Sequence, residues 1–147
     1  MDKNNYNNCK IVTWNCQGTL KIDQMKSFIR QQQPQILAIL EARRIDKPNA
    51  KLEPTGCTVV QTEGNNPIIA FIKKDVTYQK TDVQLEEKNE RASNILNIRI
   101  NHNGNIRHIS IVYAHPRSRH KTVEDCLDRS KPKSGSWLIM GSQRQKQ

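Results

Sequence analysis

The fold of this chain is decided by residues 11–43, which read IVTWNCQGTLKIDQMKSFIRQQQPQILAILEAR. Residues 11–14 form a β-prone run that stops at a polar, glycine-containing turn, so a strand should end at Asn15. Apolar residues then recur at helical spacing, until Pro34 disfavours helical backbone in the residue before it. The pattern therefore predicts a helix over residues 22–32, packed on a sheet.

A second strand is predicted at residues 36–40, where five apolar residues follow one another without interruption. Such a run is typical of a strand buried on both faces, and Glu41 follows it directly. If the two strands are parallel neighbours joined by the helix, Asn15 and Glu41 lie side by side. One carboxylate beside an amide suits a hard cation such as Mg²⁺, which keeps waters for a phosphate substrate. The alternative is that Glu41 is a solvated residue or caps a helix.

Residues 14–18 (WNCQG) and 34–43 (PQILAILEAR) resemble the opening motifs of the endonuclease/exonuclease/phosphatase family, which has the DNase I-like fold. Within that family the chain is similar to the apurinic-type endonuclease domain of LINE-type (non-LTR) retrotransposons. The resemblance implies that Asn15 and Glu41 belong to a catalytic cluster that binds Mg²⁺. One departure is Gln17, at a position where apurinic endonucleases often have Asp.

Antiparallel strands are predicted for the middle of the chain. Residues 57–62 are β-branched, residues 67–72 form a buried run, and the turn between them implies a hairpin. Residues 76–83 alternate polar and apolar side chains, as an edge strand does. A second hairpin should join residues 94–100 to residues 106–113 through an Asn-Gly turn.

The second hairpin ends in residues 112–116 (VYAHP), which resemble a family motif whose tyrosine borders the scissile phosphate. By this match Tyr113 takes that role, and His115 is a one-residue insertion before the proline. The alternative is that Tyr113 is an ordinary aromatic residue at a strand end. The four histidines form no helical pair of metal ligands, so they are expected to be exposed.

Positive charge dominates the composition, because 24 Lys and Arg face 14 Asp and Glu and give a net charge of +10. This balance favours nucleic acid as the partner, with an anionic membrane surface as the second candidate. Two short basic segments are suited to non-specific phosphate contacts. They contain Arg43 and Arg44 after the predicted metal site, and Arg117, Arg119 and Lys121 before a predicted helix. The alternative for Arg43 and Arg44 is that they are solvated loop charges.

No apolar run approaches the roughly 20 residues that a membrane-spanning helix needs, and the N-terminus lacks the apolar core of a signal peptide. We therefore expect a soluble, intracellular protein of the nucleus or cytoplasm with no membrane partner. The four cysteines are scattered without a C-x-x-C pair, so reduced thiols are expected.

Residues 136–141 (SWLIMG) resemble the buried strand that precedes the family's G-D-F-N motif. Here Ser142 stands in place of the Asp and Arg144 in place of the Asn, and the family's later general-base His has no counterpart. The resemblance spans about three fifths of the family's domain. Because the metal, the activated water and the stabilised leaving group act as a unit, we expect a degenerate fragment that is inactive alone.

The sequence thus predicts an α/β (α+β) fold, a truncated DNase I-like two-layer β-sandwich flanked by helices at residues 22–32 and 122–128. Thr122 is expected to cap the second helix. We expect a disordered N-terminus at residues 1–8, the family-like part at residues 9–141, and a divergent polar tail beyond it.

Three functions stay open at this stage. The leading one is a degenerate endonuclease fragment with weak, non-specific DNA binding. The second is an active nuclease or phosphodiesterase completed by another chain, and the third is a non-enzymatic interaction module. Ile69, Phe71, Ile111 and Leu138 are expected to lack a covering layer, which favours a homo-oligomer or a complementing chain.

Overall fold

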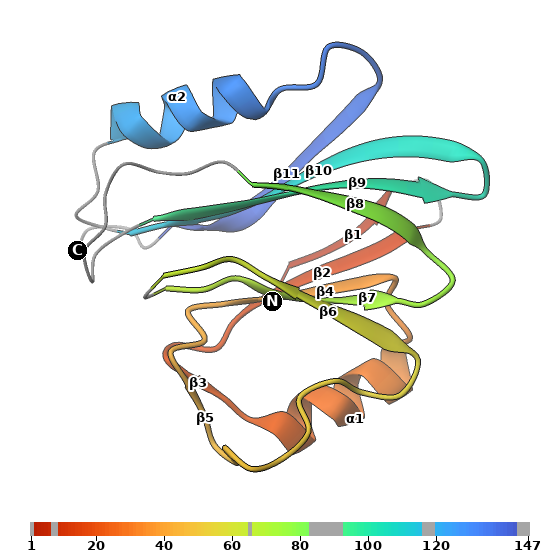
Figure 1. Ribbon diagram of the computed structural model, residues 1–147, viewed down its shortest axis with the longest axis vertical. Coiled ribbons are helices and arrows are strands. Elements are labelled where there is room, and N and C mark those ends of the chain that lie inside the picture. Colours follow the sequence, from red (N-terminus) through yellow and green to blue (C-terminus); the bar gives the residue numbers. More distant parts are fainter. Residues whose placement is uncertain (1, 7–8, 65, 83–92, 116–119, 144–147) are drawn as a thin grey trace.

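Two β-sheets lie face to face, with one helix on the outer face of each (Figure 1). The computed structural model describes residues 2–6, 9–64, 66–82, 93–115 and 120–143. The helices are α1 (Ile22–Gln32) and α2 (His120–Ser130). The predicted helix over residues 22–32 is confirmed, whereas α2 begins two residues before Thr122, so Thr122 lies inside the helix and is not its cap.

The first sheet has five strands in the order β1-β2-β4-β7-β6. These strands are β1 (Asp2–Tyr6), β2 (Cys9–Asn15), β4 (Ile36–Leu40), β6 (Cys57–Gln61) and β7 (Ile69–Lys73). The hairpin expected between residues 57 and 72 is present as the antiparallel pair β6–β7. The N-terminus differs from the expectation, because Asp2–Tyr6 pairs antiparallel with β2 instead of fraying. Backbone hydrogen bonds to the edge of β2 hold this polar segment in place, and such bonds do not depend on the type of side chain.

The second sheet has four strands in the order β11-β10-β9-β8. They are β8 (Thr77–Asp82), β9 (Asn94–His102), β10 (Asn105–Ala114) and β11 (Ser136–Gln143). The predicted Asn-Gly hairpin is confirmed as β9–β10, and β8 is an edge strand as expected. The strand expected to be buried, β11, is instead the other edge strand, and its Ile139 is 48% exposed.

Each sheet contains one parallel pair, and in both cases a helix connects its two strands. In the first sheet β2 and β4 are parallel, with Asn15 opposite Leu40. In the second sheet β10 and β11 are parallel, with Tyr113 opposite Ser142. Since β2 and β11 also contact each other across the sandwich, the structure brings the two strand–helix–strand units together. The remaining pairs in both sheets are antiparallel.

The apolar residues expected to be uncovered are buried within the chain. Ile111 lies in the core between the two sheets, and Ile69 and Phe71 face α1 on the outer side of the first sheet. Leu138 is partly buried against the core between the sheets. The expectation of a bare sheet face is therefore wrong, because both sheets come from this one chain and its crossover helices cover their outer faces. Neither described helix combines the length and apolarity that crossing a membrane requires.

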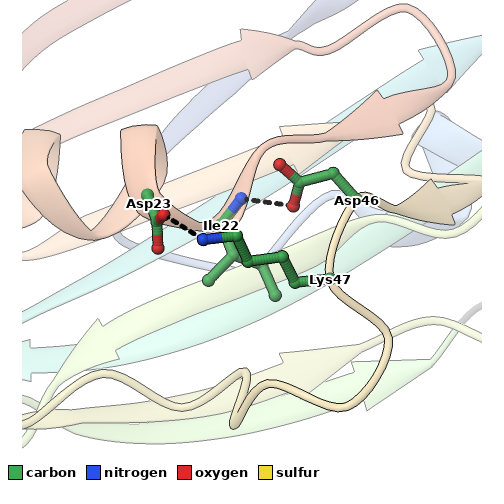
Figure 2. Close-up of polar contacts among 4 residues, drawn as sticks. All are labelled: Ile22, Asp23, Asp46 and Lys47. Carbon is green, nitrogen blue, oxygen red and sulfur yellow. Dashed lines mark hydrogen bonds and ion pairs between the residues drawn. The ribbon is translucent and has the colours of Figure 1, made fainter.

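The start of α1 is closed by residues that follow Glu41 in the sequence. Lys21 precedes the helix and makes no side-chain cap, whereas Asp46 Oδ1 accepts a hydrogen bond from the Ile22 N–H at 3.0 Å. Lys47 forms an ion pair with Asp23 of the first turn (Figure 2). Together these contacts tie the segment after β4 to the segment after β2.

A short two-stranded sheet reinforces this connection. Its strands are β3 (Thr19–Leu20) and β5 (Arg44–Ile45), which pair in parallel. Arg44, for which a solvated loop position was the alternative, therefore lies in a strand. Its pairing fixes the backbone on both sides of the predicted metal site.

Candidate functional site

The turn after β2 is joined to the end of β4 by backbone hydrogen bonds. The Cys16 N–H donates to the Leu40 carbonyl at 3.1 Å, and the Gly18 N–H donates to the Glu41 carbonyl at 3.0 Å. Asn15 and Glu41 therefore lie at the C-terminal ends of neighbouring parallel strands, as the sequence predicts. Their roles in catalysis and metal binding stay predictions.

Glu41 is buried, with 1% of its surface exposed, although it carries a carboxylate. Its backbone φ is 57°, in the left-handed region that non-glycine residues seldom adopt. Such a conformation costs about 1–3 kcal/mol and is found most often at functional sites. A buried acidic residue in an unfavourable backbone conformation at a strand end supports a functional role for Glu41.

The second sheet contributes Tyr113, near the end of β10, to the site beside Glu41. Its phenol makes hydrogen bonds with the side chains of Glu41 and Arg43. Burial, followed by the hydrogen bond and charge of Glu41, raises the pKa of Tyr113 to about 12, and Arg43 acts in the opposite direction. Tyr113 therefore stays protonated at neutral pH, and its O–H donates a hydrogen bond to the Glu41 carboxylate, while the Arg43 guanidinium donates one to the phenol oxygen.

Two asparagines hold the rim of this site. The Nε of Arg43 donates to Asn66 Oδ1 at 3.0 Å, and Asn94 Nδ2 donates to the Asn66 carbonyl at 2.5 Å. Asn94 is also the register partner of Tyr113 across β9 and β10. Since Asn66 is completely buried, it forms a fixed support for Arg43.

His115 is part of the site, contrary to the expectation that the histidines are simply exposed. It is half-buried, and its ring stacks on that of Tyr113 with the centroids 6.4 Å apart and the planes at 10°. Its backbone N–H donates to Ser93 Oγ at 2.8 Å. The period-two spacing from Tyr113 could have indicated this shared face, since residues i and i+2 of a strand point the same way. Asn66 and Asn94 had no comparable sequence signal.

The remaining predicted residues are placed less completely. Arg44 is exposed in β5, and its guanidinium lies near Gly18 of the turn. Lys121 is in the first turn of α2, whereas Arg117 and Arg119 fall outside the described residues. The backbone of Ser142 lies opposite Tyr113, at this end of the sandwich.

Solved structures share this arrangement of strands and helices. A humanized form of TDP2 from D. rerio with 14 mutations superposes with a TM-score of 0.67 at 14% identity, over 89% of this chain and 60% of that one. The endonuclease domain of TRAS1, a telomere-specific non-LTR retrotransposon, gives a TM-score of 0.59 at 18% identity, over 88% of this chain and 58% of that one.

The chain has the DNase I-like fold. No family model and no curated protein sequence matches it, so the identification comes from the structure. The chain spans about three fifths of the length of each of these two DNase I-like structures. The two-layer sandwich flanked by helices is thus the fold observed.

Within this DNase I-like fold, Glu41 is the acidic side chain that the strand ends bring together with Asn15 and Tyr113. No group of three or more His, Cys, Asp and Glu side chains that could hold a metal occurs in the part of the chain that the structure describes. The oxygen atoms that could bind a metal here belong to the Glu41 carboxylate, the Asn15 amide and the Tyr113 phenol.

The raised pKa of Tyr113 predicts a loss of stability in alkaline solution. The folded-state pKa of about 12 lies above the ordinary value of 10.0, so between these values the folded chain keeps a proton that the unfolded chain releases. This contribution is fully present below about pH 10 and is lost as the pH rises towards 12, and its size is about 2–3 kcal/mol. Urea unfolding of wild type and Tyr113→Phe across this range measures it. The stability advantage of wild type over the variant should shrink as the pH rises, and a constant difference would contradict the prediction.

Proposed function

We propose that this chain is a retrotransposon-type endonuclease-fold segment that binds DNA without sequence preference beside Glu41 and does not cleave it alone. The observation that supports this best is the convergence of Asn15, Glu41 and Tyr113 from three strands at one end of the sandwich. Phosphodiester chemistry needs such a cluster of oxygen donors next to cationic groups.

The donors present are compatible with Mg²⁺, which prefers oxygen ligands and usually takes only one or two carboxylates. Glu41 and Asn15 are the residues that would hold it, and the Asn15 Oδ1 already accepts a hydrogen bond from the Gln17 N–H at 2.8 Å. A bound Mg²⁺ would supply Lewis-acid polarisation of a phosphate oxygen. The chain's own contribution is positional, because Tyr113 orients the Glu41 carboxylate and Arg43 offers a guanidinium at the rim.

The loss of cleavage is proposed from the replacement of the family's Asp by Ser142. A serine hydroxyl cannot supply the negative charge that an Asp carries. Since catalytic groups that act as a unit are strongly non-additive, one missing member is expected to abolish most of the rate.

DNA binding is proposed from the charge balance and from the exposed pair Arg43 and Arg44. Arg43 is already oriented by Asn66, so it can contact a phosphate with little loss of side-chain freedom. With about three phosphate contacts, a fourfold rise in salt should lower the affinity roughly 40-fold through counterion release.

A second candidate is an active nuclease completed by another chain, and the exposed edge of β11 favours it. β11 ends the order of the four-stranded sheet among the described strands, and its Ile139 is 48% exposed. A strand from a second chain could pair there and add the missing acidic and basic groups.

One experiment tests the proposed function with two readouts. Supercoiled plasmid incubated with the purified chain and Mg²⁺ should stay intact, while duplex DNA binding should weaken strongly from low to moderate salt. Replacing Arg43 and Arg44 by glutamine should weaken binding, whereas the matched control Arg99→Gln, an exposed arginine on β9, should not.

An EDTA arm and the Glu41→Gln variant identify the source of any cleavage. Metal-dependent nicking that disappears in Glu41→Gln would overturn the proposed inactivity. Affinity that is indifferent to salt, or reduced equally by Arg99→Gln, would overturn the proposed binding site.

A further inference from the structure

A cavity of about 730 Å³ opens at the opposite end of the first sheet from Glu41. Its walls are the part of α1 from Lys26 onward, the loop of residues 51–56 and the end of β7. The two sites lie at opposite ends of β4. Glu41 directly follows the last residue of β4, whereas Lys73 of the cavity donates its backbone N–H to the carbonyl of Gln35, which directly precedes the first residue of β4. Five strand residues place them about 17 Å apart.

Five cationic side chains line this cavity and only one acidic side chain, Glu53, opposes them. The cations are Lys26 and Arg30 from α1, Lys51 from the loop, and Lys73 and Lys74 from β7 and the turn after it. Within the described ranges, none of these five forms a salt bridge. The cavity therefore concentrates positive charge that Glu53 offsets only in part.

The walls are held together by backbone hydrogen bonds. The Lys74 N–H donates to the Gly56 carbonyl at 2.9 Å, and the Cys57 N–H donates to the Pro54 carbonyl at 3.2 Å. The loop, β6 and the end of β7 thus form one unit. The cations project from a preformed cavity, which reduces the entropy lost on binding an anion.

The pKa of Cys57, which lines this cavity, is affected by the same charged side chains. Burial raises the pKa of the Cys57 thiol, the positive charges of Lys73 and Lys74 oppose that rise, and Glu53 adds to it. Cys57 therefore stays a neutral, buried part of the wall. The charged hydrogen-bond donors available to a ligand are ammonium and guanidinium groups.

These groups select a multiply charged oxyanion. Lysines act as point charges for phosphate, and an arginine can grip two of its oxygens. The lining contains no aromatic residue, so it offers no platform for stacking a base. The volume lies within the range of about 300–1,000 Å³ that is usual for sites of small ligands.

We propose that this cavity binds a run of linked phosphate groups, in a free polyphosphate or in a nucleic-acid backbone. The site recognises the phosphates and not the bases. It is independent of the proposed site at Glu41, because it uses different residues at the other end of the sheet.

The test uses inorganic tripolyphosphate, a short single-stranded oligonucleotide and the full chain. Tripolyphosphate should shift the amide resonances of Gly56, Lys73 and Lys74, and calorimetry should give a measurable affinity. The double variant Lys73→Gln/Lys74→Gln should weaken this binding by about tenfold or more. The matched control Lys131→Gln/Lys133→Gln removes two exposed lysines after α2 and should leave the affinity unchanged.

The outcomes separate the possible phosphate sources. Competition by the oligonucleotide would identify a nucleic-acid backbone, and its absence would identify a free polyphosphate. The proposal is overturned if the amide resonances of Gly56, Lys73 and Lys74 do not shift on adding tripolyphosphate. It is also overturned if the control double variant weakens binding as much as the double variant of the cavity. Thermal melting of both variants checks that they fold, and the Arg43→Gln/Arg44→Gln variant should bind tripolyphosphate normally even if the site at Glu41 binds no DNA.

Discussion

Replacing Phe71 by alanine should lower the free energy of unfolding by about 3–5 kcal/mol. Phe71 is 1% exposed in β7 and packs with Met25 and Ile29 of α1 and with Leu37 of β4. Alanine leaves a cavity between the helix and the sheet that the surrounding backbone cannot fill. Because a domain is stabilised by only about 5–15 kcal/mol in total, the variant should be close to unfolding.

The control for this prediction is Ile106→Ala on β10, since Ile106 is 45% exposed. Chemical denaturation of both variants, with the mass in solution measured alongside, is the experiment. The control should change stability by less than about 1 kcal/mol. A similarly small effect of Phe71→Ala would show that the first sheet and α1 are not packed as described.

Replacing Gly141 by alanine should cost about 3 kcal/mol or more, because the new methyl group has no room. A Cβ at this position would lie 2.0 Å from the carbonyl oxygen of Val112, its register partner on β10. The obstacle is backbone, so it cannot rotate away as a flexible side chain would. The parallel pair β10–β11 must separate locally to accept the methyl group.

Gly135→Ala is the matched control, since Gly135 immediately precedes β11. Gly135 has a φ of 92°, and the nearest atom to a Cβ there is a ring carbon of His108 at 3.7 Å. Its substitution should therefore cost only the conformational penalty of a positive φ, about 1–2 kcal/mol. Hydrogen exchange should show lost protection along β11 in Gly141→Ala alone. Equal losses of stability in the two variants would contradict the steric explanation.

Local pattern was enough to predict most of the elements correctly. The helical spacing before Pro34 predicted α1 with the bounds observed, and the Asn-Gly pair predicted the β9–β10 hairpin. The placement of Asn15 beside Glu41 also followed from the sequence, since a helical crossover between consecutive strands makes them parallel neighbours. These features depend on residues close together in the chain.

The errors concerned contacts between distant segments. Ile69 and Ile111 were expected on one bare face, whereas they lie in different cores, one under α1 and one between the sheets. The polar residues 2–6 became a strand because the edge of β2 offered hydrogen bonds. Neither result can be read from periodicity, which shows that a residue is buried but not what covers it.

The sequence by itself therefore determined most of the elements and the placement of Asn15 beside Glu41, because turn residues and hydrophobic spacing act over a few residues. Only the tertiary structure placed His115 on Tyr113 and Asn66 under Arg43, and assembled the basic cavity from α1, a loop and β7. Those contacts join residues far apart in sequence, and they exist only because the two sheets and their helices pack in one arrangement among the many that local pattern allows.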